Sequence, residues 1–296
     1  MKKLVLGFFL KMVVADNLKE ATSLLSWPQF TELPRGSLWL LLYGFSFRIF
    51  ADFAGYSLIA QGLARLFGYE LPLNFLHPYL APSLTDFWRR WHLSLSSWLR
   101  EYLYIPLGGN RLGEGRTYVN LFLVMFLGGL WHGAAWHFVA WGALNGVVLA
   151  LRPSRIQTKS GNAEADRIAP EQLANRETRS KGLFTRDRAF HMLRMLLTFL
   201  MVCVGWTLFR AANCADAVNI LAKIARHSID PGFSFDCLVA AMGARNREGF
   251  AVAVAGVFLL EGVFRRHPHP LTALMGKWPR PFRWAAYTAL IWACAF

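Results

Sequence analysis

Long apolar runs alternate with short polar and basic segments along the chain. Three of the runs, residues 37–67, 117–151 and 191–211, contain the roughly 20 residues that a helix needs to cross a bilayer. Residues 250–264 form a shorter run, which we interpret as a second crossing after residues 191–211. The pattern predicts an all-α, polytopic membrane helix bundle that forms a single transmembrane domain over residues 1–296.

The run at residues 117–151 is longer than one perpendicular span. If it crossed once, the basic segments on its two sides would face opposite compartments, whereas basic loops prefer the cytoplasmic side. A break or re-entrant turn at Gly128-Gly129 or at Gly133 would return the chain to its starting side. Non-helical backbone at membrane depth is tolerated only where it is buried in protein or lines a cavity, so such a break would shelter His132.

The charge of the loops predicts the rest of the topology. Residues 152–190 are polar, rich in Arg and Lys and without hydrophobic periodicity, which predicts a solvated, mobile cytoplasmic loop. Two later crossings would return the basic residues 265–283 to the cytoplasmic side. Residues 213–248, where acidic and basic side chains balance, would then face outward.

A second region of interest is residues 83–105, where aromatic side chains recur at three- and four-residue steps and predict a single interfacial helix. The stripe on this helix consists of Phe87, Trp91, Leu95, Trp98 and Tyr102. His92 would lie near Trp88 and Ser96, on a mainly apolar side of the helix. The composition of residues 106–111 predicts a turn after it.

Composition excludes several classes of protein. Hydrophobic residues make up 55% of the chain and charged residues 17%, which places it outside the ordinary soluble class. The net charge of +14 could suggest nucleic-acid binding, but the basic residues lie in loops between apolar runs, so membrane topology explains them better. The four cysteines show no CxxC or metal-ligand spacing, and we expect neither a zinc site nor a disulfide framework.

Ionisable side chains inside apolar runs are costly, so each is a candidate for function. His132 is the first candidate, with a structural histidine bonded to a carbonyl as the alternative. Asp52 and Arg48 are the next, and they could simply pair with each other across one helical turn. His137 follows His132 by five residues, which puts the two on different helix faces and disfavours a two-histidine metal site.

Several motifs together resemble the membrane-bound O-acyltransferases, in particular their alginate O-acetylase-like branch. The strongest are Phe-Trp-Arg-Arg-Trp-His-Leu-Ser at residues 87–94, Tyr-Leu-Tyr-Ile-Pro-Leu-Gly-Gly-Asn-Arg at residues 102–111 and Gly-Leu-Trp-His-Gly at residues 129–133. Further matches occur at residues 13–17, 52–57, 74–79 and 205–211. Their order along nearly the whole chain makes the set specific, although a lone Trp-His-Gly would be weak.

The resemblance implies a helix bundle around a funnel in the plasma (inner) membrane of a bacterium. An acyl donor such as acetyl-CoA or an acyl carrier would supply the group, without a bound cofactor. The acceptor would be an exported, alginate-like polysaccharide, reached directly or through an extracytoplasmic partner acyltransferase. The family pattern assigns catalysis to His132 and His92, and substrate-channel or structural support to Asp52, Arg48, Trp131, Trp88, Asn110 and Arg111.

The chain departs from the family pattern at three points. Family members normally carry several further spans before the point that corresponds to Met1. Leu58 stands where a second acidic residue is usual, and Asn145 where a histidine is common. Two alternatives therefore stay open: an inactive truncated remnant, or a transporter or flippase that uses Arg48, Asp52, His132 and Glu261 as a charge relay. The two halves of the chain lack the internal symmetry common in transporters, and this argues against the transporter alternative.

Overall fold

The computed structural model describes residues 2–151 and 185–226, together with a few isolated positions between 279 and 288. Within these residues the regular elements are helices, which confirms the predicted all-α class. The chain divides into two compact units, Met1–Asn74 with Trp206–Phe296 and Phe75–Gly205, and we describe each unit by itself.

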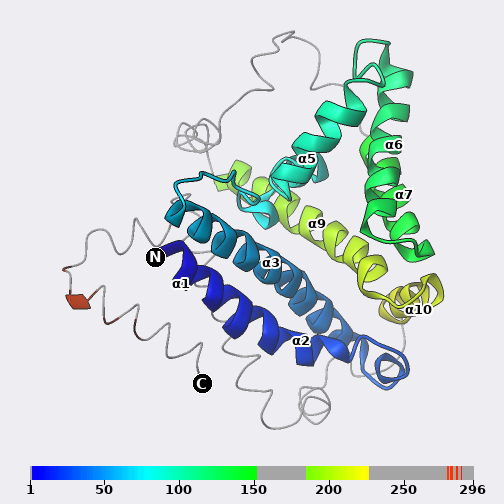
Figure 1. The fold of residues 1–296 in the computed structure, drawn as a ribbon. Coiled ribbons are helices and arrows are strands. Elements are labelled where there is room, and N and C mark those ends of the chain that lie inside the picture. Colours follow the sequence, from blue (N-terminus) through cyan, green and yellow to red (C-terminus); the bar gives the residue numbers. More distant parts are fainter. Residues whose placement is uncertain are drawn as a thin grey trace. The chain divides into compact units, whose positions relative to one another are not determined.

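The first unit is built on two long helical segments that lie side by side (Figure 1). One segment runs without interruption through Lys2–Phe8 (α1), a π-helical stretch Phe9–Ala15 (η1) and Asp16–Ser23 (α2). The other is the single helix Arg35–Leu66 (α3), which follows the short 3₁₀ turn Gln29–Thr31 (η2). Helix Cys214–Ala225 (α10) also packs against α3.

Two glycines allow α1 and α3 to approach closely. A Cβ atom on Gly7 would lie 2.8 Å from the carbonyl oxygen of Gly55, and a Cβ on Gly55 would lie 2.8 Å from the carbonyl oxygen of Gly7. Small residues at facing positions are the usual way in which membrane helices bring their backbones together. Around this contact, Leu10, Val14 and Leu41 are almost fully buried, so the core of the unit lies between α3 and the helical segment beside it.

The second unit begins with short elements and continues with long ones. The short elements are Pro78–Leu80 (η3), Leu84–Trp88 (α4), Leu93–Leu99 (α5) and the π-helical turn Arg100–Tyr104 (η4). The long helices are Glu114–His132 (α6), Trp136–Ala150 (α7) and Thr185–Arg210 (α9), and the boundary between the two units falls inside α9.

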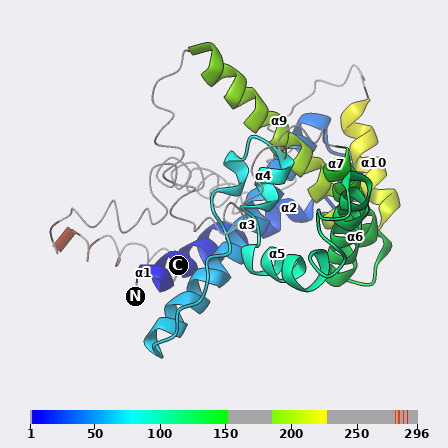
Figure 2. The ribbon, with the colours of Figure 1, turned by 90° about the horizontal axis from the view of Figure 1, so that it is seen from above.

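Helices α6 and α7 form an antiparallel hairpin with a short break after His132. Figure 2 shows the two helices lying against each other. A Cβ on Gly142 would lie 2.5 Å from the carbonyl oxygen of Met125, and a Cβ on Gly129 would overlap the carbonyl oxygen of Phe138. The two helix backbones are therefore in direct contact along these glycines. Of the two predicted positions for a break, Gly133 is confirmed, whereas Gly128-Gly129 lies inside α6. Both ends of the run at residues 117–151 lie at the same end of the hairpin.

The prediction of one helix over residues 83–105 is wrong. Helix α4 ends at Trp88, and α5 begins after His92, whose φ of 48° and ψ of 56° lie in the left-handed region. An isolated antiparallel bridge between Phe75 and Trp91 and a 3.0 Å hydrogen bond from Leu76 N–H to the Arg90 carbonyl hold the chain at this break. These contacts come from a distant part of the sequence, so helical periodicity did not indicate them.

The break also divides the aromatic stripe. Phe87 and Trp91 are buried, and both rings pack against the ring of Tyr79, with centroids 6.1 and 5.9 Å from it. Trp98 and Tyr102 stack on each other at 5.6 Å but are 52% and 67% exposed. Only the second half of the stripe therefore faces outward, as an interfacial helix would require.

Two described helices are long and apolar enough to cross a membrane: α3 and the Ala189–Arg210 part of α9. They correspond to two of the apolar runs in the sequence. Helix α9 begins at Thr185, inside the last residues of the predicted loop at 152–190. The rest of that loop and the predicted crossing at residues 250–264 lie outside the described residues.

Candidate active site

His92 lies in the connection between α4 and α5, at the position that precedes the first residue of α5. A left-handed conformation is uncommon for a residue other than glycine and is tolerated where the surrounding structure enforces it. Here the bridge at Trp91 fixes the backbone immediately before it. The Ser94 hydroxyl lies 3.5 Å from the Nδ1 atom of the imidazole, which is half-buried.

His132 is the last residue of α6, and the break of the hairpin follows it directly. Its ring packs edge-on against the ring of Trp131, with centroids 4.9 Å apart, and against Trp141 of α7 at 5.4 Å. Phe138 contacts the same imidazole at 6.4 Å. Aromatic side chains from both arms of the hairpin thus surround a titratable group that is only half-exposed.

The structure brings these two histidines into one cluster. The rings of His92 and Trp131 are 6.2 Å apart, and Trp131 in turn contacts His132. Burial, and to a smaller extent the electrostatic effect of His132, lower the pKa of His92 from its ordinary value of 6.5 to about 4. Because burial disfavours the charged form of the imidazole, His92 is neutral near pH 7.

Three tryptophans line the cluster. Trp88 packs edge-on against Trp141, with ring centroids 5.6 Å apart, and Trp131 is 59% exposed at the outer side. The indole Nε1 of Trp88 is buried and has no hydrogen-bond acceptor among the described residues. A buried donor without an acceptor costs about 1–3 kcal/mol, so a ligand carbonyl or a water at this position would be stabilised.

Sequence reasoning missed the part that Trp141 plays. Its ring is 4% exposed and contacts the rings of both His132 and Trp88, so it connects the hairpin with helix α4. The motif Trp141-Gly142-x-x-Asn145-Gly146 could have indicated this tryptophan, but sequence reasoning considered only Asn145 in it. Asn145 is buried and donates a hydrogen bond of 2.9 Å to the Trp141 carbonyl, so it supports the same turn of α7.

The remaining sequence candidates of this unit lie away from the cluster. Asn110 and Arg111 are exposed in the turn after η4, and the structure records no contact between either of them and the two histidines. Asn120 holds this turn instead, because its side-chain amide donates to the carbonyls of Leu107 and Gly109 at 3.1 and 2.9 Å. Asn120 is fully buried, and sequence reasoning did not single it out.

His137 contacts the ring of Phe138 at 4.2 Å, and no contact between it and His132 is recorded. Among the described residues no group of three or more His, Cys, Asp or Glu side chains could hold a metal ion. The side chains of the cluster can transfer protons through imidazole and donate hydrogen bonds through indole.

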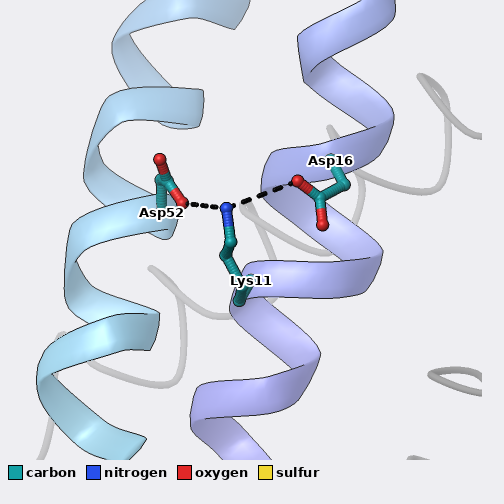
Figure 3. A network of polar contacts seen from close by, with 3 residues as sticks. All are labelled: Lys11, Asp16 and Asp52. Atoms are coloured by element: carbon teal, nitrogen blue, oxygen red, sulfur yellow. Dashed lines mark hydrogen bonds and ion pairs between the residues drawn. The ribbon is translucent and has the colours of Figure 1, made fainter. Parts of the chain in front are cut away.

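Asp52 and Arg48 belong to the first unit. Asp52 does not pair with Arg48, as the sequence had suggested, but with Lys11 at 2.5 Å, and Lys11 also reaches Asp16 at 3.5 Å (Figure 3). The physical reason is that η1 places Lys11 opposite Asp52, while the guanidinium of Arg48 turns toward Thr22 and donates to its hydroxyl at 3.1 Å. Sequence reasoning missed Lys11, whose partner is 41 residues away.

Comparison with known proteins shows which family the chain resembles. Residues 1–156 match the model of the MBOAT, membrane-bound O-acyltransferase, family. Over 72% of this chain, a protein of Pseudomonas putida named "Probable alginate O-acetylase AlgI" is 40% identical. A peptidoglycan O-acetyltransferase of Helicobacter pylori is 38% identical over 73% of the chain. A teichoic acid D-alanyltransferase of Streptococcus thermophilus is 30% identical over 62% of the chain.

These alignments cover 38%, 36% and 47% of the three relatives, so the chain spans less than half of the proteins that it matches. The family match covers more than half of this chain and includes both histidines of the cluster, the hairpin that carries His132 and the paired helices of the first unit. The chain therefore belongs to the membrane-bound O-acyltransferase family.

Proposed function

We propose that the chain provides the acyl-transfer site of a membrane O-acetyltransferase that modifies an exported polysaccharide, with His132 as the general base. The observation that carries the proposal is the convergence of His92 and His132 around Trp131, at the break of an apolar hairpin. Residues 40 positions apart in the sequence meet there, and both lie in the segment that matches the family.

The proposed reaction transfers an acyl group from a thioester to a hydroxyl. The imidazole of His132 accepts the hydroxyl proton while the hydroxyl oxygen forms the ester bond to the thioester carbonyl carbon. The carbon–sulfur bond breaks, and the departing thiolate takes the proton from the imidazolium. A positioned base of this kind contributes roughly 10²- to 10⁴-fold to the rate.

Two neighbours would assist His132. A neutral His92 adds no positive charge and can orient the acceptor or His132 through a hydrogen bond. The indole N–H of Trp88 is a donor available to the acyl carbonyl oxygen, on which negative charge develops in the transition state. The exposed ring of Trp131 would then lie at the entrance.

The donor in this proposal is acetyl-CoA or an acyl carrier, and the acceptor is an alginate-like polymer of the cell surface. The named functions of the relatives support acyl transfer to surface polymers, namely alginate, peptidoglycan and teichoic acid. A polymer outside the membrane would be reached directly or through an extracytoplasmic partner acyltransferase. The site of action would be the bacterial inner membrane.

The test is replacement of His132 by Gln at the native locus, with His137→Gln as the matched control. Both positions are half-buried histidines near the same break, and both rings contact Phe138, but only His132 belongs to the cluster. We expect His132→Gln to reduce O-acetylation of surface glycans by roughly 10²-fold or more, as measured by mass spectrometry, because it removes the base. His137→Gln should retain most of it.

Membrane levels of both variants are compared by immunoblotting, so that loss of protein is not mistaken for loss of chemistry. Acetylation at the wild-type level in the His132→Gln strain, with the protein present in the membrane, would rule out His132 as the base.

A further inference from the structure

Two arginines of the first unit converge on one threonine. Arg48 of α3 donates from Nη1 to the hydroxyl of Thr22 at 3.1 Å. Arg210, the last residue of α9, donates from Nη2 to the main-chain carbonyl of Thr22 at 3.3 Å and to the hydroxyl of Ser26 at 3.0 Å. Thr22 is fully buried at the end of α2, so both guanidiniums contact the same buried residue.

The oxygens that receive these hydrogen bonds are all neutral. Within the described residues neither arginine forms an ion pair, and the Nε atom of Arg210 is buried without a hydrogen-bond acceptor. The carboxylates of Asp52 and Asp16 act on Arg48 electrostatically, but both already pair with Lys11 (Figure 3). Arg48 is also close enough to Arg210 to repel it electrostatically.

The charges of this region therefore do not balance. Lys11, Arg48 and Arg210 contribute three positive charges, whereas Asp16 and Asp52 contribute two negative charges. Buried guanidinium groups normally face a carboxylate or a phosphate, because their planar N–H groups match two oxygens of such an anion. A pair of arginines that donate only to neutral oxygens and repel each other has the composition of an anion site.

We propose that Arg48, Arg210 and Ser26 form a binding site for a phosphate group, which we term the arginine-pair site. Arg210 ends the helix Ala189–Arg210, which is long and apolar enough to span a membrane. The end of a span lies at the level of the lipid headgroups, where phosphates are abundant. A phosphate would receive the free Nε–H of Arg210 and cancel the repulsion between the two guanidiniums.

The phosphate can come from a phospholipid headgroup or from phosphate in solution, and the experiment distinguishes the two sources. The full chain is purified in a phosphate-free detergent. Native mass spectrometry then measures retention of phosphatidylglycerol against diacylglycerol with the same acyl chains, which lacks the phosphate. Thermal unfolding is measured in parallel with inorganic phosphate and with chloride at equal ionic strength.

Arg210→Gln and Arg48→Gln are the test variants, and Arg65→Gln is the matched control. Arg65 lies on the same helix as Arg48, but it is exposed and pairs with Glu70 at 3.0 Å. We expect each test variant to weaken phosphate binding by about tenfold or more, the effect of losing one charged hydrogen bond. Arg65→Gln should bind like the wild type. If Arg210→Gln does not fold, the result for Arg48→Gln decides the test. Among the described residues Arg48 donates only to the Thr22 hydroxyl, so its loss leaves the main-chain hydrogen bond of Arg210 in place.

If the wild type prefers phosphatidylglycerol and the test variants lose this preference, the site binds a lipid. If inorganic phosphate raises the melting temperature of the wild type but not of the test variants, the site binds phosphate from solution. The proposal is overturned if the wild type binds neither probe, if the test variants bind as the wild type does, or if Arg65→Gln loses as much binding as they do. None of these results depends on acyl transfer, so the proposal stands or falls separately from the proposed function.

Discussion

His92 combines an unfavourable backbone conformation with a side chain that resists protonation. Its left-handed φ is enforced by the bridge at Trp91, and burial together with His132 lowers its pKa to about 4. Strained residues persist where the rest of the structure fixes them, and they are frequent at active sites. The bridge thus fixes the backbone of a histidine whose imidazole is half-buried, and this burial is the main cause of its lowered pKa.

The pKa of His92 predicts how stability depends on pH. In the unfolded chain this histidine takes up a proton near pH 6.5, but in the folded protein only near pH 4. Proton binding therefore favours the unfolded state as the pH falls below about 6.5. The resulting loss of folding stability grows until the histidine of the folded protein also takes up a proton, near pH 4. Thermal unfolding between pH 7.5 and pH 5 should show a smaller loss of stability for His92→Gln than for the wild type.

The control for this measurement is His191→Gln, which removes an exposed histidine of α9. It should leave the pH dependence of the melting temperature as in the wild type. If His92→Gln also follows the wild-type curve from pH 7.5 to pH 5, then His92 is not the group that resists protonation.

The ion pair between Lys11 and Asp52 should contribute modestly to stability. Both side chains are about half exposed, at 41% and 47%, so the pair is not enclosed in the core of the unit. A double-mutant cycle with Lys11→Met and Asp52→Asn should give a coupling free energy of about 0.2–1 kcal/mol, the usual range for exposed pairs. A coupling energy of zero would mean that Lys11 is held by Asp16 alone.

At the scale of elements, the α6–α7 hairpin depends on backbone contact at glycines. A methyl group on Gly142 would lie 2.5 Å from the carbonyl oxygen of Met125, which belongs to the opposite helix and cannot rotate away. Gly142→Ala should therefore destabilise the protein by about 1–3 kcal/mol, the usual effect of overpacking. The measurement is thermal or denaturant unfolding of the purified protein in detergent.

Gly115→Ala provides the control, because a Cβ there meets nothing within 4 Å. Alanine favours a helix more than glycine does, so this variant should be as stable as the wild type or slightly more stable. Equal effects of the two substitutions would show that close packing at Gly142 is not what holds the hairpin.

Helices that follow from local patterns were predictable from the sequence, whereas those shaped by distant contacts were not. The break after His132 followed from the length of one apolar run and from the basic segments beside it. The break at His92 did not, because the aromatic period continues across it and the opposing contact comes from Phe75. The motifs identified both histidines of the cluster, but their order in the sequence did not show that Trp131 lies between them.

At the scale of the whole molecule, the hairpin has a consequence for membrane topology. Because α6 and α7 run antiparallel, the chain enters and leaves this element at the same end. The basic residues before α6 and after α7 can then lie on one side of the membrane, as basic loops prefer. Helix α9 follows as a helix of spanning length, so its end at Arg210 should lie on the opposite side.

Cysteine labelling tests this topology in a variant whose four native cysteines are replaced by serine. Single cysteines are introduced at Arg116 and Leu151, which flank the hairpin, and at Ala212, which follows α9; all three positions are exposed. In intact cells a membrane-impermeant maleimide should label only the cysteine at position 212, and permeabilisation should expose the other two. Labelling of positions 116 and 151 from opposite sides would show that residues 117–151 cross the bilayer, because a hairpin that returns to its starting side cannot separate its own ends.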